Sequence, residues 1–134
     1  MILIHELCHV YSPGTVFEKK ALDHVDLKIE DGEILGIIGH TGSGKSTLIQ
    51  HLNGLLKPTE GAVYFNGEDI HDKDFSMKKL RSKIGLVFQY PEHQLFESTV
   101  IEDVQFGPKN MGLDPLAMEM RSFEALKQVG LGEE

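Results

Sequence analysis

The chain has 134 residues, of which 40% are hydrophobic and 25% charged, and its formal net charge at pH 7 is −8. This size and composition fit one ordinary globular domain with a core. The acidic balance argues against a nucleic-acid partner bound through a basic surface, because phosphate neutralisation needs clustered Lys and Arg. The single cysteine, Cys8, cannot form an internal disulfide, and no apolar run approaches the roughly 20 residues that span a bilayer.

Strand patterns dominate the beginning of the chain. Residues 2–10 are predicted to form a strand, and residues 25–29 alternate apolar and charged side chains as in a half-buried strand. Asp31-Gly32 then predicts a hairpin turn into the apolar run 34–38, which indicates a strand covered on both faces. In the first strand, His5 and His9 are expected on one face and Cys8 on the other, so no metal site is expected from these three.

A phosphate-binding pattern follows directly. Residues 39–47 read Gly-His-Thr-Gly-Ser-Gly-Lys-Ser-Thr and match the P-loop motif G-x-x-x-x-G-K-[ST]. Its glycines let the backbone curl until N–H groups point at a phosphate, and the next helix adds its own free N–H groups. Lys45 is expected to reach the β- and γ-phosphates, and Ser46 to ligate Mg²⁺. Apolar residues at helical spacing predict that helix, with Gly54 and Pro58 at its end.

The middle of the chain returns to short elements. Residues 62–65 are predicted as a strand that ends in the hairpin dipeptide Asn66-Gly67. Ser76 is placed to cap a short helix. Residues 84–88 form another apolar run and predict a strand, which puts Gln89 at its carboxyl end, where ligands bind in open α/β sheets. A neutral amide there could ligate Mg²⁺ or orient a water molecule.

From about residue 98 the pattern becomes helical. Thr99 and Glu102 match a capping box and predict a helix over residues 100–106, which Gly107-Pro108 is expected to break. Asp114 followed by proline predicts a second helix, and Gly130 is a suitable residue just past its end.

The stretch from Val87 to Pro108 resembles the Q-loop region of ABC transporter ATPases, and more narrowly the ATP-binding subunits of energy-coupling-factor (cobalt-type) importers. The variant of the P-loop in residues 39–47 and the segment Tyr11–Asp26 are similar to the same subfamily. The resemblance covers the whole chain. It implies an α/β fold: a P-loop NTPase core of ABC ATPase type with an N-terminal antiparallel β subdomain and the start of a helical subdomain.

The implied domain organisation is a single truncated ABC ATPase domain over residues 1–134. Its antiparallel β layer would comprise residues 1–33 and 62–67, its P-loop core residues 34–61 and 68–97, and its helical subdomain would start at residue 98. The family's Leu-Ser-Gly-Gly-Gln signature, its strand ending in Asp-Glu and its later switch histidine do not occur in the sequence. We therefore expect the chain to correspond to about the first half of such an ATPase.

The resemblance also implies residue roles. Tyr11 would stack on adenine, with Phe17 as its rival, and Gln89 would contact Mg²⁺ and the attacking water. Lys45 and Gln89 would thus be catalytic, and Ser46 and Gln89 would hold the metal. The segment Tyr90–Phe96 would face the coupling helix of a transmembrane partner. The implied ATP-binding residues are Tyr11, Gly39, Thr41, Gly42, Ser43, Gly44, Lys45, Ser46 and Thr47.

The implied function is an ATP-binding importer subunit that couples ATP binding and hydrolysis to uptake of a small molecule such as a vitamin or metal ion. Its partners would be a second ATPase subunit, identical or not, a transmembrane subunit and a membrane substrate-binding component, at the cytoplasmic face of the membrane. The alternatives are a nucleotide-binding fragment without catalysis, a DNA-associated ABC ATPase, and a small-molecule kinase. The absence of long heptads disfavours the second, and the expected β hairpin before the P-loop disfavours the third.

Overall fold

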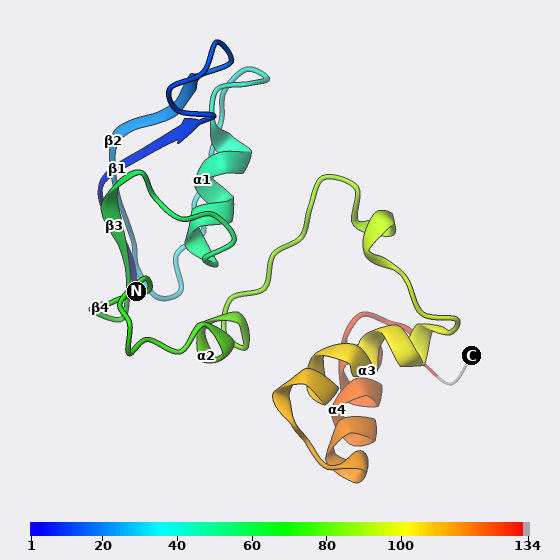
Figure 1. Cartoon of the computed structure of the whole chain (residues 1–134). Helices are drawn as coiled ribbons and strands as arrows, with labels where there is room; N and C mark the ends of the chain where they lie inside the picture. Colours follow the sequence, from blue (N-terminus) through cyan, green and yellow to red (C-terminus); the bar gives the residue numbers. More distant parts are fainter. Residues whose placement is uncertain (133–134) are drawn as a thin grey trace. The chain divides into compact units, whose positions relative to one another are not determined.

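The computed structural model describes residues 1–132, so Glu133 and Glu134, the last residues of the expected helical subdomain, lie outside the described part. The chain divides into two compact units between Leu86 and Val87. The first contains all the strands, and the second contains two longer helices (Figure 1). The sequence-based division placed the start of the helical subdomain at residue 98.

A four-stranded antiparallel sheet in the order β2-β1-β3-β4 forms the frame of the first unit. Strand β1 (Ile2–Tyr11) pairs with both β2 (Lys19–Ile29) and β3 (Glu60–Phe65). Asn66 and Gly67, with φ angles of 50° and 87°, turn β3 into β4 (Glu68–Asp69). The predicted strands over residues 2–10, 25–29 and 62–65 and the Asn-Gly hairpin are therefore confirmed.

One hydrophobic cluster holds the sheet to the two helices of this unit. Helix α1 (Lys45–Leu52) contributes Leu48, and helix α2 (Met77–Arg81) contributes Leu80. The predicted cap of α2 is confirmed, because the Ser76 side chain accepts the Lys79 N–H at 3.3 Å. The buried members of the cluster are Ile4, Leu7, Leu22, Leu48, Val63, Ile70 and Leu80.

A β-bulge in β1 overturns the predicted faces of its histidines. Glu6 has a φ of 50°, and the register against β2 shifts between Ile4 and Leu7, which are both fully buried in the core. Because a bulge adds one residue, the alternation inverts across it. His9 therefore shares the core face with Leu7, whereas His5 is exposed on the opposite face, the side to which Cys8 also belongs.

Two predicted strands, over the apolar runs 34–38 and 84–88, are not strands in the described structure. Residues 33–40 and 84–88 carry no ladder pairing in the described structure. Ile37 and Ile84 pack on the core, but Ile34 and Ile38 are 99% and 96% exposed. The predicted hairpin at Asp31-Gly32 and the strand covered on both faces were wrong. An apolar run becomes a strand only where a neighbour supplies hydrogen bonds, and these runs have none within residues 1–132.

The second unit contains a 3₁₀ turn, η1 (Pro91–Gln94), and helices α3 (Val100–Met111) and α4 (Pro115–Gln128). Thr99 and Asp114 cap α3 and α4 as predicted. Helix α3 does not break at Gly107-Pro108 but continues for another turn. Proline removes only one backbone donor there, and the Pro108 carbonyl accepts the Leu113 N–H at 3.2 Å once Gly112 has closed the helix.

The end of α4 is closed by the glycine that the sequence indicates. Gly130 has a φ of 82°, and its N–H donates to the Lys127 carbonyl while the Leu131 N–H donates to the Leu126 carbonyl. This pair of bonds is the Schellman arrangement. Across residues 1–132, every helix is too short or too polar to cross a membrane.

The bulge at Glu6 predicts a strict requirement for glycine on the facing strand. Gly61 has a φ of 81°, and a Cβ there would lie 2.6 Å from the His5 carbonyl and still closer to that of Glu6. Gly67 has a similar φ of 87° but open space around it. Urea unfolding should show that Gly61→Ala lowers the free energy of unfolding by about 1–3 kcal/mol more than Gly67→Ala. Equal losses would contradict the packing argument.

Acid is expected to destabilise the first unit through His51 in α1. Burial lowers the pKa of His51 below its ordinary value of 6.5, and burial also lowers the pKa of His71. The unfolded chain therefore binds the proton at a higher pH than the folded chain does. The free energy of unfolding has its full value above about pH 6.5 and decreases as the pH falls below that. His51→Gln should reduce the loss of unfolding free energy between about pH 7.5 and about pH 5.5 by roughly 1 kcal/mol.

The exposed His93 in the second unit supplies the control. His93→Gln should leave the pH dependence of the unfolding free energy unchanged, as measured by urea titrations followed by circular dichroism. A pH dependence in His51→Gln that equals that of the parent chain would show that the buried imidazole does not carry the effect.

Candidate phosphate-binding site

The P-loop is held against strand β2 where helix α1 begins. Gly44, the residue before the helix, has a φ of 94°, and a Cβ there would lie 2.5 Å from the Ala21 carbonyl. Gly42 also has a positive φ, of 83°. The motif therefore needs glycine twice for backbone conformation, and at Gly44 also for close approach to the sheet.

Lys45 folds back across its own loop. Its Nζ donates to the carbonyls of Gly39 at 2.7 Å and His40 at 2.8 Å, and it lies 3.3 Å from the Ser43 Oγ. The first N–H bond of α1 is that of Leu48 to the Gly44 carbonyl. The preceding amides therefore have no partner within the helix, and they add the positive end of its dipole to the charge of Lys45.

A second lysine that the sequence reading missed also lies at the loop. The Lys19 Nζ lies 3.9 Å from where a Cβ of Gly42 would be, which places another positive charge beside the turn. Its neighbour Lys20 instead pairs with Asp23, at 3.0 Å. No local pattern distinguishes the two lysines, because the difference arises from the direction of β2 and its register against β1.

Four polar side chains connect the sheet to the first turns of α1. The Tyr11 hydroxyl shares a 3.1 Å hydrogen bond with the Thr47 hydroxyl, and the His51 Nδ1–H donates to the Thr47 carbonyl at 2.7 Å. The His9 ring lies edge-on to both Tyr11 and His51, with centroids 4.6 and 4.7 Å apart. This Tyr11–His9–Thr47–His51 network joins α1 to β1, next to the contact of Gly44 with the paired strand β2.

The buried end of the network is held neutral. His51 is fully buried, and its Nε2 has no hydrogen-bond partner within the described residues. With Nδ1 donating to a carbonyl, the neutral ring leaves Nε2 as an acceptor. A proton on Nε2 would bury an uncompensated charge, which is why burial lowers the pKa of His51.

The expected site residues fall into both units. The first unit brings Tyr11 together with the P-loop through the Thr47 contact, and Thr41, Ser43 and Ser46 are exposed there. Phe17, the rival of Tyr11, is 80% exposed in the turn between β1 and β2. Gln89 and the segment Tyr90–Phe96 belong to the second unit. Gln89 follows irregular chain, so its expected position at the end of a strand was wrong.

The segment Tyr90–Phe96 is exposed yet locally ordered. Tyr90 stacks on His93 with ring centroids 5.7 Å apart, and Phe96 meets Phe106 of α3 edge-on at 4.9 Å. Asp103 of α3 accepts the Phe96 N–H at 3.3 Å. Nevertheless Tyr90 and Phe96 are 57% and 62% exposed. Contacts within the second unit therefore present aromatic side chains outward.

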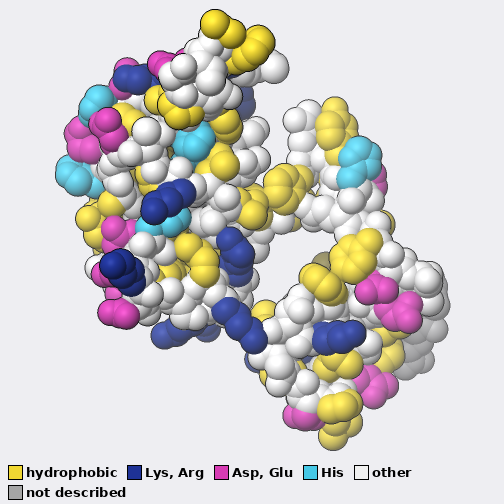
Figure 2. Space-filling model, in the orientation of Figure 1, with side chains coloured by type: hydrophobic (Ala, Val, Ile, Leu, Met, Phe, Trp, Pro, Cys, Tyr) yellow, Lys and Arg dark blue, Asp and Glu magenta, His cyan; other side chains and the backbone are white. Residues whose placement is uncertain are grey.

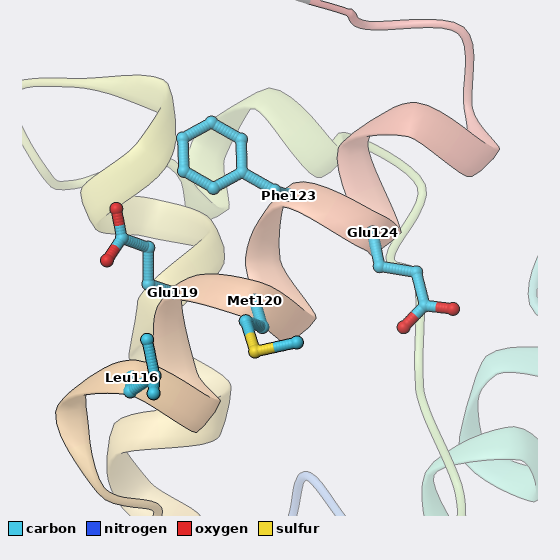
Figure 3. Close-up of a pocket in the computed structure, with 5 residues that line it drawn as sticks. All are labelled: Leu116, Glu119, Met120, Phe123 and Glu124. Atoms are coloured by element: carbon cyan, nitrogen blue, oxygen red, sulfur yellow. The ribbon is translucent and has the colours of Figure 1, made fainter.

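Apolar side chains also reach the surface elsewhere on both units (Figure 2). On α4 a surface pocket is lined by Leu116, Met120 and Phe123, with Glu119 and Glu124 at its sides (Figure 3). The three apolar residues recur at helical spacing and are each more than half exposed. The pocket holds no group that could act on a phosphate.

Comparisons with known proteins place this geometry in a family. The ABC transporter family model matches residues 22–134. The energy-coupling factor transporter ATP-binding protein EcfA2 of Clostridium acetobutylicum is 57% identical over 130 residues, which are 97% of this chain and 46% of that protein. EcfA2 of Caldanaerobacter subterraneus is 52% identical over 133 residues, 99% of this chain and 46% of that protein. The chain thus spans about half the length of the curated relatives it matches.

Solved structures agree with the sequence relatives. CbiO1 from Clostridium perfringens, described as part of the ABC transporter complex cbiONQ, superimposes with a TM-score of 0.78 at 41% identity, over 97% of this chain and 50% of that one. The ATP-binding cassette MJ0796, solved as a dimer bound to ADP and Pi, gives 0.80 at 30% identity, over 99% and 59%. With an α/β fold of this kind and a family model that matches most of its residues, the chain belongs to the ABC transporter family.

Proposed function

We propose that this chain is the nucleotide-binding part of the ATP-binding subunit of an energy-coupling-factor importer, and that it binds Mg-ATP at residues 39–47. The observation that carries the proposal is the P-loop itself: Lys45 crosses the loop at the free N-terminus of α1. The identity of more than half the aligned residues with two EcfA2 proteins supports the narrower class. The whole protein would couple ATP hydrolysis to uptake of a small molecule.

In this proposal the phosphates take the place of the loop carbonyls as partners of Lys45. The backbone N–H groups of Gly42, Gly44 and the first turn of α1 would contact the β- and γ-phosphates. Ser46 is exposed on that first turn, so its hydroxyl is available as a ligand for Mg²⁺, together with Gln89. Bound Mg²⁺ would neutralise charge on the phosphates, and Gln89 would orient the attacking water.

Tyr11 is the better placed of the two expected adenine contacts. Its hydroxyl shares a hydrogen bond with Thr47 of the P-loop helix, while the residue as a whole remains 39% exposed. A ring that is already fixed loses little conformational freedom when a base stacks on it. Phe17 is exposed without such a tie, so we assign the stacking role to Tyr11.

The proposed partners follow from the assignment to an energy-coupling-factor importer. The outward aromatic residues of Tyr90–Phe96 would contact a transmembrane subunit, since apolar surface of this kind marks interaction sites. A second ATPase subunit, a membrane substrate-binding component and a position at the cytoplasmic face of the membrane complete the proposal. Nucleic acid is not among the partners.

Lys45→Ala should weaken Mg-ATP binding to the full chain by about tenfold to a hundredfold, measured by isothermal titration calorimetry, because a hydrogen bond to a charged phosphate is lost. Lys28→Ala is the matched control, since Lys28 is an exposed lysine on β2 that pairs with Glu30. AMP, which lacks a β-phosphate, should bind the parent chain more weakly than ADP. Equal affinities in both lysine variants would contradict the assignment.

We expect this chain to bind Mg-ATP without steady turnover. Phosphoryl transfer needs an oriented water and charge stabilisation from several fixed groups, and Gln89 lies in irregular chain rather than at a strand end. Phosphate release from the purified chain should therefore equal that of Lys45→Ala. Steady phosphate release that Lys45→Ala abolishes would contradict this expectation, whereas a parent chain that binds no Mg-ATP in the titration above would contradict the site.

A further inference from the structure

We propose that Cys8, His24 and Glu60 form a binding site for a divalent transition-metal ion of the zinc type. One ligand atom from each residue, the Cys8 Sγ, a ring nitrogen of His24 and a carboxylate oxygen of Glu60, lies within 4.8 Å of the others. The three residues come from β1, β2 and β3, which are adjacent in the sheet. The site is separate from the proposed nucleotide site.

The backbone of the sheet brings these residues together. The bulge at Glu6 moves Cys8 to the face opposite the hydrophobic core, and Cys8 pairs in register with Glu60 of β3. On the other side, His24 adopts a φ of 46°, which is uncommon for a residue other than glycine. The sequence reading could not find this set, because it treated β1 as a regular strand and grouped Cys8 with its own neighbours.

Hydrogen bonds already orient two of the ligands. The His24 Nδ1 lies 2.8 Å from an Asp23 carboxylate oxygen, which leaves Nε2 as the nitrogen for a metal. A carboxylate on the second ring nitrogen is the usual support of a metal-bound histidine. The Cys8 Sγ accepts the backbone N–H of His24 at 3.2 Å, a bond that holds the sulfur beside the histidine.

Charge and ligand type favour zinc-like ions over magnesium. A thiolate and a carboxylate together balance a divalent charge, and His24 adds a neutral ligand. Sulfur and imidazole nitrogen are ligands for zinc and its neighbours, whereas magnesium takes oxygen. Glu6 lies near the histidine, with a carboxylate oxygen 4.0 Å from the His24 Nε2. The positive charge of Lys20, which pairs with Asp23 at 3.0 Å, opposes the binding of a cation.

Cobalt(II) is a suitable probe, because a cobalt–thiolate bond gives a charge-transfer absorption that oxygen and nitrogen ligands do not. The tag-free full chain, without nucleotide, should bind one Co²⁺ with this absorption, and Zn²⁺ but not Mg²⁺ should displace it. Cys8→Ser should abolish the absorption. His24→Asn and Glu60→Gln, which change exposed side chains, should each weaken binding by at least about tenfold.

His5→Asn is the matched control, since His5 is an exposed histidine of β1 that pairs with Asp26 instead. It should leave cobalt affinity and absorption unchanged. Cobalt binding without the thiolate absorption, or with equal affinity in the parent chain and in His24→Asn and Glu60→Gln, would overturn the proposal. Should Cys8→Ser fail to fold, those two exposed variants still decide the result.

Discussion

The close approach of Gly44 to strand β2 is the contact on which the rest of the proposed nucleotide site depends. A side chain at this position would meet the Ala21 carbonyl at 2.5 Å and the Leu22 side chain at 3.2 Å. This contact therefore fixes how closely the first residues of α1 lie to the antiparallel sheet. In this chain the segment before the loop has no ladder partner among the described residues, so the sheet, not that segment, positions the P-loop helix.

The Tyr11–His9–Thr47–His51 network provides the second fixed point of that helix. The Tyr11–Thr47 hydrogen bond and the contact between the His9 and His51 rings join β1 to the first two turns of α1, so the loop is held at β2 and the helix body at β1. A buried imidazole with one unpartnered nitrogen costs stability. In return, the imidazole bonds to the Thr47 carbonyl and contacts the His9 ring of β1. An aliphatic side chain in place of His51 would fill the space without the bond to the Thr47 carbonyl.

The sequence predicted those features that a few neighbouring residues determine. The caps at Ser76, Thr99 and Asp114 and the Asn66-Gly67 turn each depend on local hydrogen bonds, and all are present. Features that depend on distant partners were missed. The run 34–38 has the composition of a strand but lacks a neighbour, and the bulge at Glu6 is possible only because Gly61 faces it across β3. The position of Lys19 beside the loop has the same non-local origin.

The exposed apolar residues of the two units have different physical origins. Ile34 and Ile38 are exposed while Ile37 packs inward, which is the alternation of an extended chain that lacks neighbours on its outer face. Tyr90 and Phe96 are exposed although stacking on His93 and Phe106 holds them. Contacts that hold aromatic side chains outward reduce the entropy lost on binding. This difference supports our proposal that Tyr90–Phe96, rather than the chain around Ile34, would contact a transmembrane subunit.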